Sequence, residues 1–286
     1  MSHIILDGKA VSQAVKDEIK LEIQNLSPVS PILAVVLIGD DKGSKVYLQS
    51  LQKPCEYVGI KLLTYQLPEE TSEKELLELL NTLSISSEIN GILLYLPLPA
   101  HIDKNKIMPA IDKNKDIDCF NPYNMGLLSI KDNSGFKPCT PLGILYLLKH
   151  FNVELEGKDC VIIGRNNTVG KPLATILLAE NSTVTICHSY TKNLENITKR
   201  ADILIVTIGK SKFVTADMVK ENAVVVDVGI NVDENGKLCG DVDYDLVKGK
   251  ASYITPVPGG IGPMTTTMLL KNCLYAYKMQ NTLITP

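Results

Sequence analysis

Apolar side chains recur along the first hundred residues in two alternating patterns. Between residues 9 and 26, aliphatic residues follow one another at steps of four, which is the stripe of an amphipathic helix. A continuous apolar run at 32–38 is typical of a strand buried on both faces of a parallel sheet. The alternation continues, with further helices expected at 44–57 and 76–83, the latter after a capping box at 72–75, and further strands at 61–66 and 91–96.

The second half of the chain repeats this alternation after an interruption. Between about residues 119 and 139 the pattern gives way to Asn, Pro, Gly and Ser, so we place the domain junction there. Thr140 and Pro141 are typical of an N-cap followed by proline at the first helical position, which predicts a helix over 142–151. Later strands are expected at 161–163, 183–187, 202–208, 223–228 and 251–255, and a final helix at 264–279. Strands that alternate with helices predict an α/β fold with parallel sheets.

Composition restricts the classes of partner. A net charge of -3 gives no reason to expect nucleic acid, whose binding depends on clustered Lys and Arg. No apolar stretch approaches the roughly 18–20 residues needed to cross a bilayer, and the first residues lack the layout of a signal peptide. The seven cysteines are scattered and form no C-x-x-C pair, and only four histidines are present. We therefore expect no disulfide framework, no metal site and a reducing, cytoplasmic location.

The strongest local signal for a ligand is the loop that follows the strand at 161–163. Gly164 and Gly170 flank five residues, and a helix is expected to start near Gly170. A loop between a buried strand and a helix N-terminus presents unpaired amides and a positive dipole to a phosphate. The spacing differs from the common G-x-G-x-x-G fingerprint, so these residues alone leave open an ordinary turn between strand and helix.

The residues after the next strand indicate which dinucleotide would bind. An NAD site usually offers Asp or Glu about 20 residues beyond the first glycine, for the ribose 2′-hydroxyl. Here the strand ends in Cys187, His188 and Ser189, without a carboxylate. Arg165 and Ser189 could hold a 2′-phosphate instead, which favours NADP over NAD. For His188 a structural role at the strand end is the simpler interpretation.

Eight motifs along the chain together resemble those of the methylenetetrahydrofolate dehydrogenase/cyclohydrolase family. They are G-D followed by S-x-x-Y at 39–47, G-I-L-L-Y-L-P-L-P at 91–99, K-D-I-D at 115–118, P-C-T-P at 138–141, the loop at 164–172, D-V-G-I-N at 227–231, G-D-V at 240–242 and T-P-V-P-G-G-I-G-P-M-T at 255–265. The last is long and specific, and the set occurs in order over nearly the whole chain.

The resemblance implies two α/β domains flanking a cleft, NADP-dependent oxidation of 5,10-methylenetetrahydrofolate and a homodimer. Residues 1–139, completed by the final helix at 264–286, would bind the folate, and 140–263 would form a Rossmann-like NADP-binding domain. In that family the tyrosine matching Tyr47 stacks on the pterin, and the aspartate matching Asp118 bonds it. Further substrate contacts fall on Tyr95, Leu96, Pro97, Pro258, Gly259 and Gly260, and cofactor contacts on Gly164, Arg165, Asn166, Val169, Gly170, Ser189 and Ile230.

The sequence departs from the family pattern at the residues linked to the second family reaction, hydrolysis of the methenyl product. The family lysine, four residues after the tyrosine and one helical turn on, is Leu51 here, and the glutamine that supports it is Tyr95. Lys53, the third candidate catalytic residue beside Tyr47 and Asp118, lies about 240° around the helix from Tyr47.

Hydrolysis needs proton movement, whereas hydride transfer mainly needs orientation. We therefore expect the dehydrogenase to persist and the cyclohydrolase to be weak or absent. Two alternatives are a fully bifunctional enzyme, in which Lys53 or a water replaces the lysine, and a non-catalytic folate- or nucleotide-binding protein.

Overall fold

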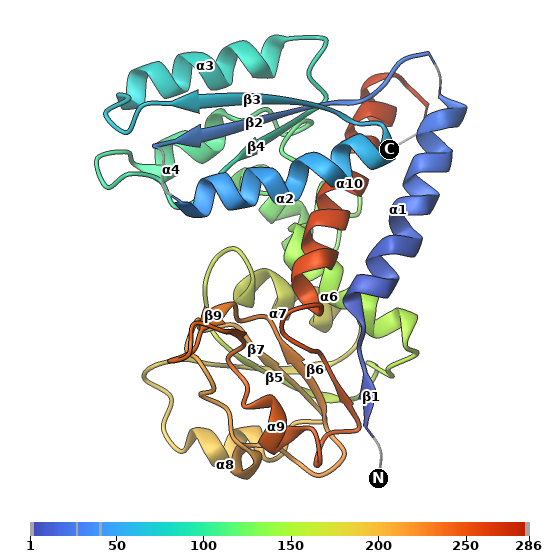
Figure 1. Cartoon of the computed structure of the whole chain (residues 1–286), viewed down its shortest axis with the longest axis vertical. Coiled ribbons are helices and arrows are strands. Elements are labelled where there is room, and N and C mark those ends of the chain that lie inside the picture. The colour runs from blue at the N-terminus through green and yellow to red at the C-terminus, as the bar shows by residue number, and fades with distance from the viewer. Residues whose placement is uncertain (1–2, 27, 40–41, 284–286) are drawn as a thin grey trace. The chain divides into compact units, whose positions relative to one another are not determined.

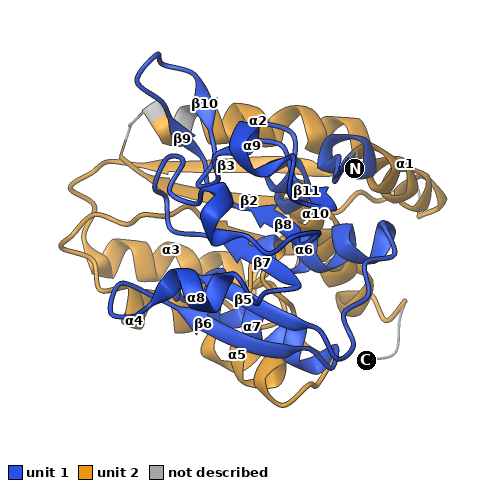
Figure 2. Ribbon diagram, turned by 90° about the horizontal axis from the view of Figure 1, so that it is seen from below, with its two compact units in different colours: residues 1–12, 140–265 blue, residues 13–139, 266–286 orange. Residues whose placement is uncertain are grey.

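The computed structural model of the chain describes residues 3–26, 28–39 and 42–283 and divides into two compact units (Figures 1 and 2). Unit 1 comprises Met1–Ser12 and Thr140–Thr265, and unit 2 comprises Gln13–Cys139 and Thr266–Pro286. Both units are built on a parallel sheet, as the alternation of strands and helices predicts. Asp40, part of one family motif, lies outside the described residues.

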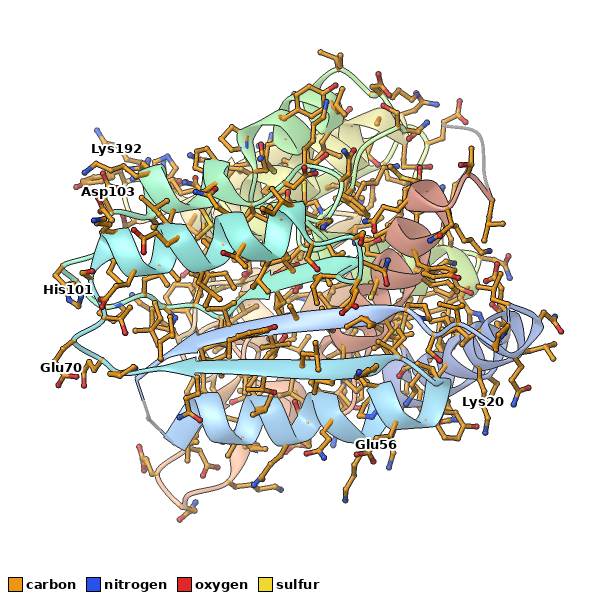
Figure 3. The ribbon with its side chains drawn as sticks, turned by 90° about the horizontal axis from the view of Figure 1, so that it is seen from above. Lys20, Glu56, Glu70, His101, Asp103 and Lys192 are labelled. Atoms are coloured by element: carbon orange, nitrogen blue, oxygen red, sulfur yellow. The ribbon has the colours of Figure 1, made fainter. Side chains whose placement is uncertain are left out.

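Unit 2 contains a three-stranded parallel sheet in the order β3-β2-β4. The central strand, β2, is buried over almost its whole length, because helices cover both faces of the sheet. In Figures 1 and 3, α3 lies on one face and α2 on the other. The strands are β2 (Ile32–Ile38), β3 (Lys61–Leu67) and β4 (Gly91–Leu94), and the helices with residues in this unit are α1 (Gly8–Asn25), α2 (Lys42–Val58), α3 (Glu73–Ile85), α4 (Lys104–Ile107), a 3₁₀ turn (Met108–Ala110), α5 (Pro122–Ser129) and α10 (Ile261–Gln280).

The capping box ahead of α3 is confirmed in both directions. The Glu75 amide donates to the Ser72 hydroxyl at 3.3 Å, and the Ser72 amide donates to the Glu75 carboxylate at 2.8 Å. Two donors that a helix N-terminus otherwise leaves unpaired are thereby satisfied. The apolar stripe that follows buries Leu76, Leu80 and Leu83 against the sheet.

Unit 1 contains a six-stranded, fully parallel sheet in the order β1-β11-β8-β7-β5-β6. Helix α7 packs on β5 and β6, whereas α8 and α9 cover the core formed on the sheet by residues such as Val161 and Leu204. The strands of this sheet are β1 (Ile4–Ile5), β5 (Asp159–Ile163), β6 (Thr183–Cys187), β7 (Ile203–Val206), β8 (Val224–Asp227) and β11 (Tyr253–Ile254). The helices are α6 (Cys139–His150), α7 (Gly170–Ala179), α8 (Leu194–Thr198), a 3₁₀ turn (Ala216–Met218) and α9 (Tyr244–Val247). Outside the sheet, β9 (Asn231–Val232) pairs with β10 (Leu238–Cys239) as an antiparallel ribbon.

Three expectations about element bounds were wrong. The strand expected at 91–96 ends at Leu94, because Pro97 offers no amide to a ladder and restricts the residue before it. The stretch 119–139 is not irregular throughout, since α5 begins there with Asn121 as its N-cap and Pro122 at its first position. Helix α10 begins at Ile261, so Pro263 lies inside its first turn rather than ahead of it.

The start of α6 also differs from the expectation that Thr140 is its N-cap. The helix begins at Cys139, whose amide donates to the Asp118 carboxylate at 3.2 Å. The Thr140 hydroxyl instead bonds the Thr265 hydroxyl at 2.9 Å. A carboxylate far away in sequence therefore satisfies an orphan amide of this helix, which a local sequence pattern cannot indicate.

None of the helices in the described part of the chain combines the length and apolar character required to span a membrane. All seven cysteines are free thiols, and six of them are buried. Over the same residues, no group of three or more His, Cys, Asp or Glu side chains is placed to hold a metal ion.

Candidate functional site

Two tyrosines form an aromatic pair in unit 2. Helix α2 carries Tyr47, and Tyr95 follows directly after β4. Their ring centroids are 4.9 Å apart and the ring planes are inclined by 37°. Burial, with the nearby Asp118 carboxylate adding to it, raises the pKa of Tyr47 far above its ordinary value. At neutral pH the Tyr47 phenol therefore offers an aromatic face and a hydroxyl rather than a base.

Asp118 is held at the carboxyl end of the same sheet. A parallel bridge between Ile92 and Asp116 aligns the segment 115–118 with β4, so Asp118 lies near the point where Tyr95 leaves the strand. Burial raises the pKa of Asp118 to about 6, while hydrogen bonds from Cys139 act in the opposite direction. Asp118 is accordingly ionised at neutral pH and can accept hydrogen bonds from a flat, amide-like ring.

The other charged residues of the K-D-I-D motif have structural roles. Lys115 is buried, and its ammonium donates to the carbonyl oxygens of Leu83 at 3.1 Å and Ser86 at 2.6 Å. The Asp116 carboxylate accepts from the Phe120 and Asn121 amides and from the Asn124 side chain, all within 2.9 Å. These bonds fix the turn that follows Asp118. Lys115 and Asp116 are therefore occupied by bonds within the protein, and Asp118 is the remaining charged residue of the motif.

Asn272 is a positioning residue that the sequence reasoning missed. Its side-chain amide, on α10, donates to the carbonyl oxygens of Ile117 at 2.7 Å and Lys137 at 3.0 Å. Those two carbonyls belong to the segments that carry Asp118 and Cys139. The available signal was an amide side chain next to Lys271, in a stretch of the final helix whose other residues are mostly apolar, which suggests a buried hydrogen-bonding partner.

Leu51 and Lys53, the two residues discussed in place of the family lysine, differ in their burial on α2. Leu51, one turn after Tyr47 on α2, is only 1% exposed. Lys53 lies on the exposed side of α2, and within the described residues it forms no hydrogen bond or ion pair. Of the remaining expected substrate residues in this unit, Leu96 is half-buried and Pro97 is exposed.

In unit 1, close packing explains both glycines of the loop after β5. Gly164 has φ +128°, and a Cβ there would lie 2.4 Å from the Thr207 carbonyl oxygen. A Cβ on Gly170 would lie 2.3 Å from the Gly164 carbonyl oxygen. The loop therefore folds back closely on itself before α7, and any larger residue would open it.

The amides of this loop are not all unpaired, contrary to the simplest expectation. The Asn166 side-chain oxygen accepts from the amides of Val169 at 2.7 Å and Gly170 at 3.1 Å, which satisfies two donors where α7 begins, although the N-cap residue itself is Val169. Over the described chain, the four amides of residues 165–168 donate no hydrogen bond to protein atoms. Those amides, rather than the first ones of α7, are available to a phosphate.

Strand register brings Arg165 next to Ser189. Ile163 of β5 pairs with Cys187 of β6, and the Gly164 amide donates to the Cys187 carbonyl at 2.9 Å. Both Arg165 and Ser189 are exposed. Arg165 offers a cation and Ser189 a hydroxyl, and neither of the two residues that follow β6, His188 and Ser189, is a carboxylate. This donor set fits a ribose 2′-phosphate.

A cavity of about 170 Å³ lies at the carboxyl ends of β8 and β11 in unit 1. It is lined by residues 227–230, 238 and 256–263, which include the expected Ile230, Pro258, Gly259 and Gly260. Ile230, at the edge of this cavity, is 69% exposed.

Two buried carboxylates organise the loops around this cavity, and the sequence analysis assigned them no role. Asp241 accepts from the amides of residues 208–210 and from the Asn231 side chain, all within 3.1 Å. Asp227 accepts from the amides of Gly229, Asp241 and Val242. Burial raises the pKa of Asp227 to about 6. In the sequence, each of these two aspartates lies in a motif that contains a glycine, D-V-G-I-N at 227–231 and G-D-V at 240–242, and this was the signal that could have indicated their role.

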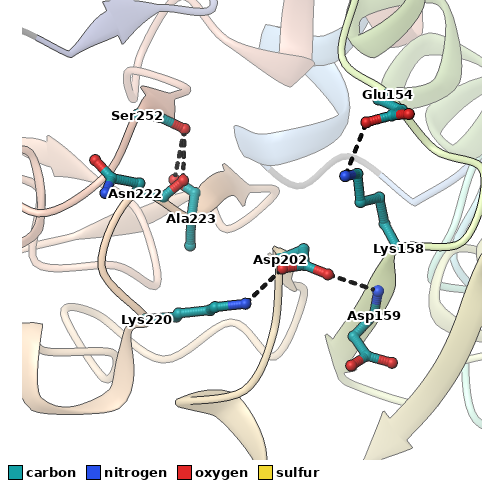
Figure 4. Close-up of polar contacts among 8 residues, drawn as sticks. All are labelled: Glu154, Lys158, Asp159, Asp202, Lys220, Asn222, Ala223 and Ser252. Atoms are coloured by element: carbon teal, nitrogen blue, oxygen red, sulfur yellow. Dashed lines mark hydrogen bonds and ion pairs between the residues drawn. The ribbon is translucent and has the colours of Figure 1, made fainter.

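A second cavity lies at the opposite, amino-terminal ends of the strands of unit 1, and Figure 4 shows the polar contacts among residues around it. Its charged groups bond one another: Asp202 accepts from the Lys220 ammonium at 2.6 Å and the Asp159 amide at 3.0 Å, and Lys158 pairs with Glu154 at 2.8 Å. These contacts join strand ends. Ligands of open α/β sheets bind at the carboxyl ends, where the loop after β5 lies.

Comparison with known proteins agrees with this arrangement. Residues 6–118 match the catalytic domain of the tetrahydrofolate dehydrogenase/cyclohydrolase family, and residues 138–281 match its NAD(P)-binding domain. The bifunctional protein FolD of Lachnoclostridium phytofermentans is 55% identical over 277 residues, which cover 96% of this chain and 98% of that protein.

Two solved structures extend the comparison. The crystal structure of the bifunctional enzyme FolD, methylenetetrahydrofolate dehydrogenase/cyclohydrolase, from Campylobacter jejuni has a TM-score of 0.96 and 49% identity, covering 97% of this chain and 99% of that one. The Trypanosoma brucei dehydrogenase-cyclohydrolase, complexed with NADP cofactor and inhibitor, has a TM-score of 0.93 and 34% identity, with 98% of each chain covered. The chain therefore belongs to the tetrahydrofolate dehydrogenase/cyclohydrolase family of enzymes, and its C-terminal half carries the family's NAD(P)-binding domain.

Proposed function

We propose that this enzyme oxidises 5,10-methylenetetrahydrofolate to 5,10-methenyltetrahydrofolate with NADP, in one-carbon folate metabolism, and that its cyclohydrolase activity is weak or absent. The observation that carries the proposal is the grouping of Tyr47, Tyr95 and Asp118 at the carboxyl end of the unit 2 sheet. A pterin is flat and rich in hydrogen-bond donors, so aromatic faces beside an ionised carboxylate suit it.

Binding and orientation are the contribution of the chain to the oxidation. The phenol ring of Tyr47 positions the pterin by stacking, and Asp118 fixes its rotation by accepting hydrogen bonds. NADP supplies the hydride acceptor when it is bound. No side chain has to gain or lose a proton during hydride transfer, so a protonated Tyr47 with a raised pKa is compatible with this step.

NADP is the proposed cofactor because of the residues at the ends of β5 and β6. Arg165 offers a guanidinium and Ser189 a hydroxyl, and both are exposed. The four unpaired amides of residues 165–168 suit the phosphates that NADP and NAD share. The 2′-phosphate of NADP would meet a cation there, whereas the 2′-hydroxyl of NAD would lack its usual carboxylate acceptor.

Hydrolysis of the methenyl product makes a different demand on the site. It needs a group that moves a proton to or from water, which is typically worth about 10²–10⁴-fold in rate. The position one turn after Tyr47 is occupied by the buried Leu51, and the ring of Tyr95 packs on Tyr47. Neither residue supplies a titratable amine. This supports a dehydrogenase with little hydrolytic activity.

Full bifunctionality is the competing proposal, and the names of the relatives favour it, since several are called bifunctional. It would require Lys53, which is exposed on α2, or a bound water to replace the family lysine. A non-catalytic folate- or nucleotide-binding protein is the third hypothesis. Both enzyme proposals require formation of NADPH from methylenetetrahydrofolate, whereas the third hypothesis excludes it, so one measurement distinguishes them.

The deciding experiment is a paired assay on one purified sample. NADPH formation from methylenetetrahydrofolate should occur at a rate typical of dehydrogenases, while decay of added methenyltetrahydrofolate should remain near the uncatalysed rate. Turnover of the methenyl compound at a rate similar to that of oxidation would establish the bifunctional enzyme instead.

A gain-of-function test addresses the residues directly. The double substitution Leu51→Lys with Tyr95→Gln should raise hydrolysis by about 10²-fold or more without improving oxidation, because it supplies an amine and the amide that supports it. Leu21→Lys, which adds an amine at a residue 62% exposed on α1 of the same unit, is the matched control and should change neither rate. A double variant that folds and oxidises methylenetetrahydrofolate but gains no hydrolysis would show that these residues do not control hydrolysis.

We further propose that the enzyme is a cytoplasmic homodimer that supports purine biosynthesis. The dimer follows from the family resemblance, and the cytoplasmic location from seven scattered cysteines, none of which is disulfide-bonded. Light scattering on the purified protein tests the first point, and fractionation of the source cells tests the second.

A further inference from the structure

A tyrosine outside the assigned set lies beside Arg165 at the cofactor end of unit 1. The Arg165 guanidinium carbon is 5.6 Å from the centroid of the Tyr190 ring, which is 78% exposed. Within the described residues, Arg165 forms no ion pair with a carboxylate. An exposed ring fills no core, so what this ring contributes must come from its contacts with neighbouring groups, and the guanidinium is one of them.

A hydrogen-bonded turn fixes the position of this ring. The His188 amide donates to the Thr191 hydroxyl at 2.8 Å, and the Thr191 amide donates to the His188 carbonyl at 2.8 Å. The Tyr190 amide donates to Nδ1 of His188 at 3.2 Å, and the two rings meet edge-on with centroids 6.1 Å apart. His188 thus has a structural task, which is to hold Tyr190 at the end of β6.

The register of the sheet brings this turn to the guanidinium. Because Ile163 pairs with Cys187, the residues that follow the two strands, Arg165 and Tyr190, leave the sheet side by side. An arginine side chain loses rotamer freedom when it binds an anion, and a contact that already restricts it reduces that cost. Cation–π contacts favour arginine and are effective even at exposed sites.

We propose that Tyr190 is a specificity-determining residue, whose ring holds the Arg165 guanidinium ready for the 2′-phosphate and so favours NADP over NAD. The proposal rests on the proposed function, in which NADP is the cofactor. Tyr190 itself acts through Arg165 and is not catalytic. Its effect should therefore be confined to the cofactor that carries the extra phosphate.

The test is equilibrium titration of the full chain with NADP and, separately, with NAD. Tyr190→Ala should raise the Kd for NADP about two- to five-fold and leave the Kd for NAD unchanged. Tyr190→Phe keeps the ring and should bind both dinucleotides like the unaltered protein. In an Arg165→Ala background, Tyr190→Ala should have no further effect, which is the signature of a coupled pair.

Tyr123→Ala is the matched control. Tyr123, in unit 2, is 51% exposed and has the Lys113 ammonium 3.9 Å from its ring centroid, so the substitution removes a similar contact away from the NAD(P)-binding domain. Both Kd values should stay unchanged. If Tyr190→Ala weakened NADP and NAD equally, if Tyr190→Phe were as harmful as Tyr190→Ala, or if the effect persisted without Arg165, the proposal would be overturned. Failure of the unaltered protein to bind NADP at all would instead refute the proposed function on which it rests.

Discussion

At the scale of single residues, the proposed folate site should respond to pH through one carboxylate. Burial places the pKa of Asp118 at about 6, between its ordinary value and neutrality. The ionised form, which is the one proposed to accept hydrogen bonds from the pterin, predominates above that pH, whereas the protonated form predominates below it. Folate binding should therefore be strong at pH 7–8 and should weaken as the pH falls through about 6.

This pH dependence can be measured as the KM for methylenetetrahydrofolate at saturating NADP. Asp118→Asn should raise the KM about ten- to hundred-fold at pH 7.5 and remove the dependence, because a charge-assisted bond is lost. Asp132→Asn is the matched control, since the Asp132 carboxylate also accepts a backbone amide, from Ser134 at 2.8 Å, but is exposed. A KM that is flat from pH 5 to 8 in the unaltered enzyme would contradict this assignment.

At the scale of elements, the loop before α7 depends on one asparagine. Asn166 satisfies two amides at the start of the helix, at 2.7 and 3.1 Å, and thereby fixes the path of residues 165–168. Asn166→Ala should lower stability by about 1 kcal/mol, because it leaves two amides at the start of α7 without their acceptor, and it should weaken NADP binding.

The neighbouring residue offers a control for that prediction. Asn167 is also exposed, but among the described residues its side chain accepts only from the Lys171 ammonium, at 2.8 Å. Asn167→Ala should therefore change stability by less than about 0.5 kcal/mol. Urea unfolding and NADP titration of the two variants provide the comparison, and equal losses in both would rule out a special role for Asn166.

At the scale of the whole molecule, the first residues of the chain complete the sheet of the unit formed by its second half. Strand β1 pairs with β11, and the Lys9 amide donates to the Gly259 carbonyl at 2.9 Å. A Cβ on Gly8 would lie 1.9 Å from the Gly260 carbonyl oxygen, so the start of α1 and the loop of residues 256–260 approach more closely than any other residue allows.

Gly8→Ala should consequently displace that loop and cost about 1–3 kcal/mol, as overpacking does. Gly249→Ala, in the same unit, meets no atom within 4 Å and should be nearly neutral. Melting temperatures report the difference in stability, and the KM values for both substrates report the loop. Unchanged stability in Gly8→Ala would show that the loop can shift without cost.

The sequence by itself determined the α/β class, the order of most strands and helices, and the residues that distinguish this chain from its family. Apolar runs and stripes reflect burial within one element, so they can be recognised from the local sequence, as in β2 and α3. The glycines at 164 and 170 and the missing lysine at position 51 could be recognised for the same reason, since a motif is a local property.

Only the tertiary structure decided which polar groups serve the site and which support it. Asp116 and Asp118 are two residues apart, yet three internal hydrogen bonds occupy Asp116 while Asp118 reaches the start of α6. The roles of Asn272 and of Tyr190 depend on partners more than twenty residues away. Such partners are selected by chain folding and strand register, and a one-dimensional pattern holds no information about them.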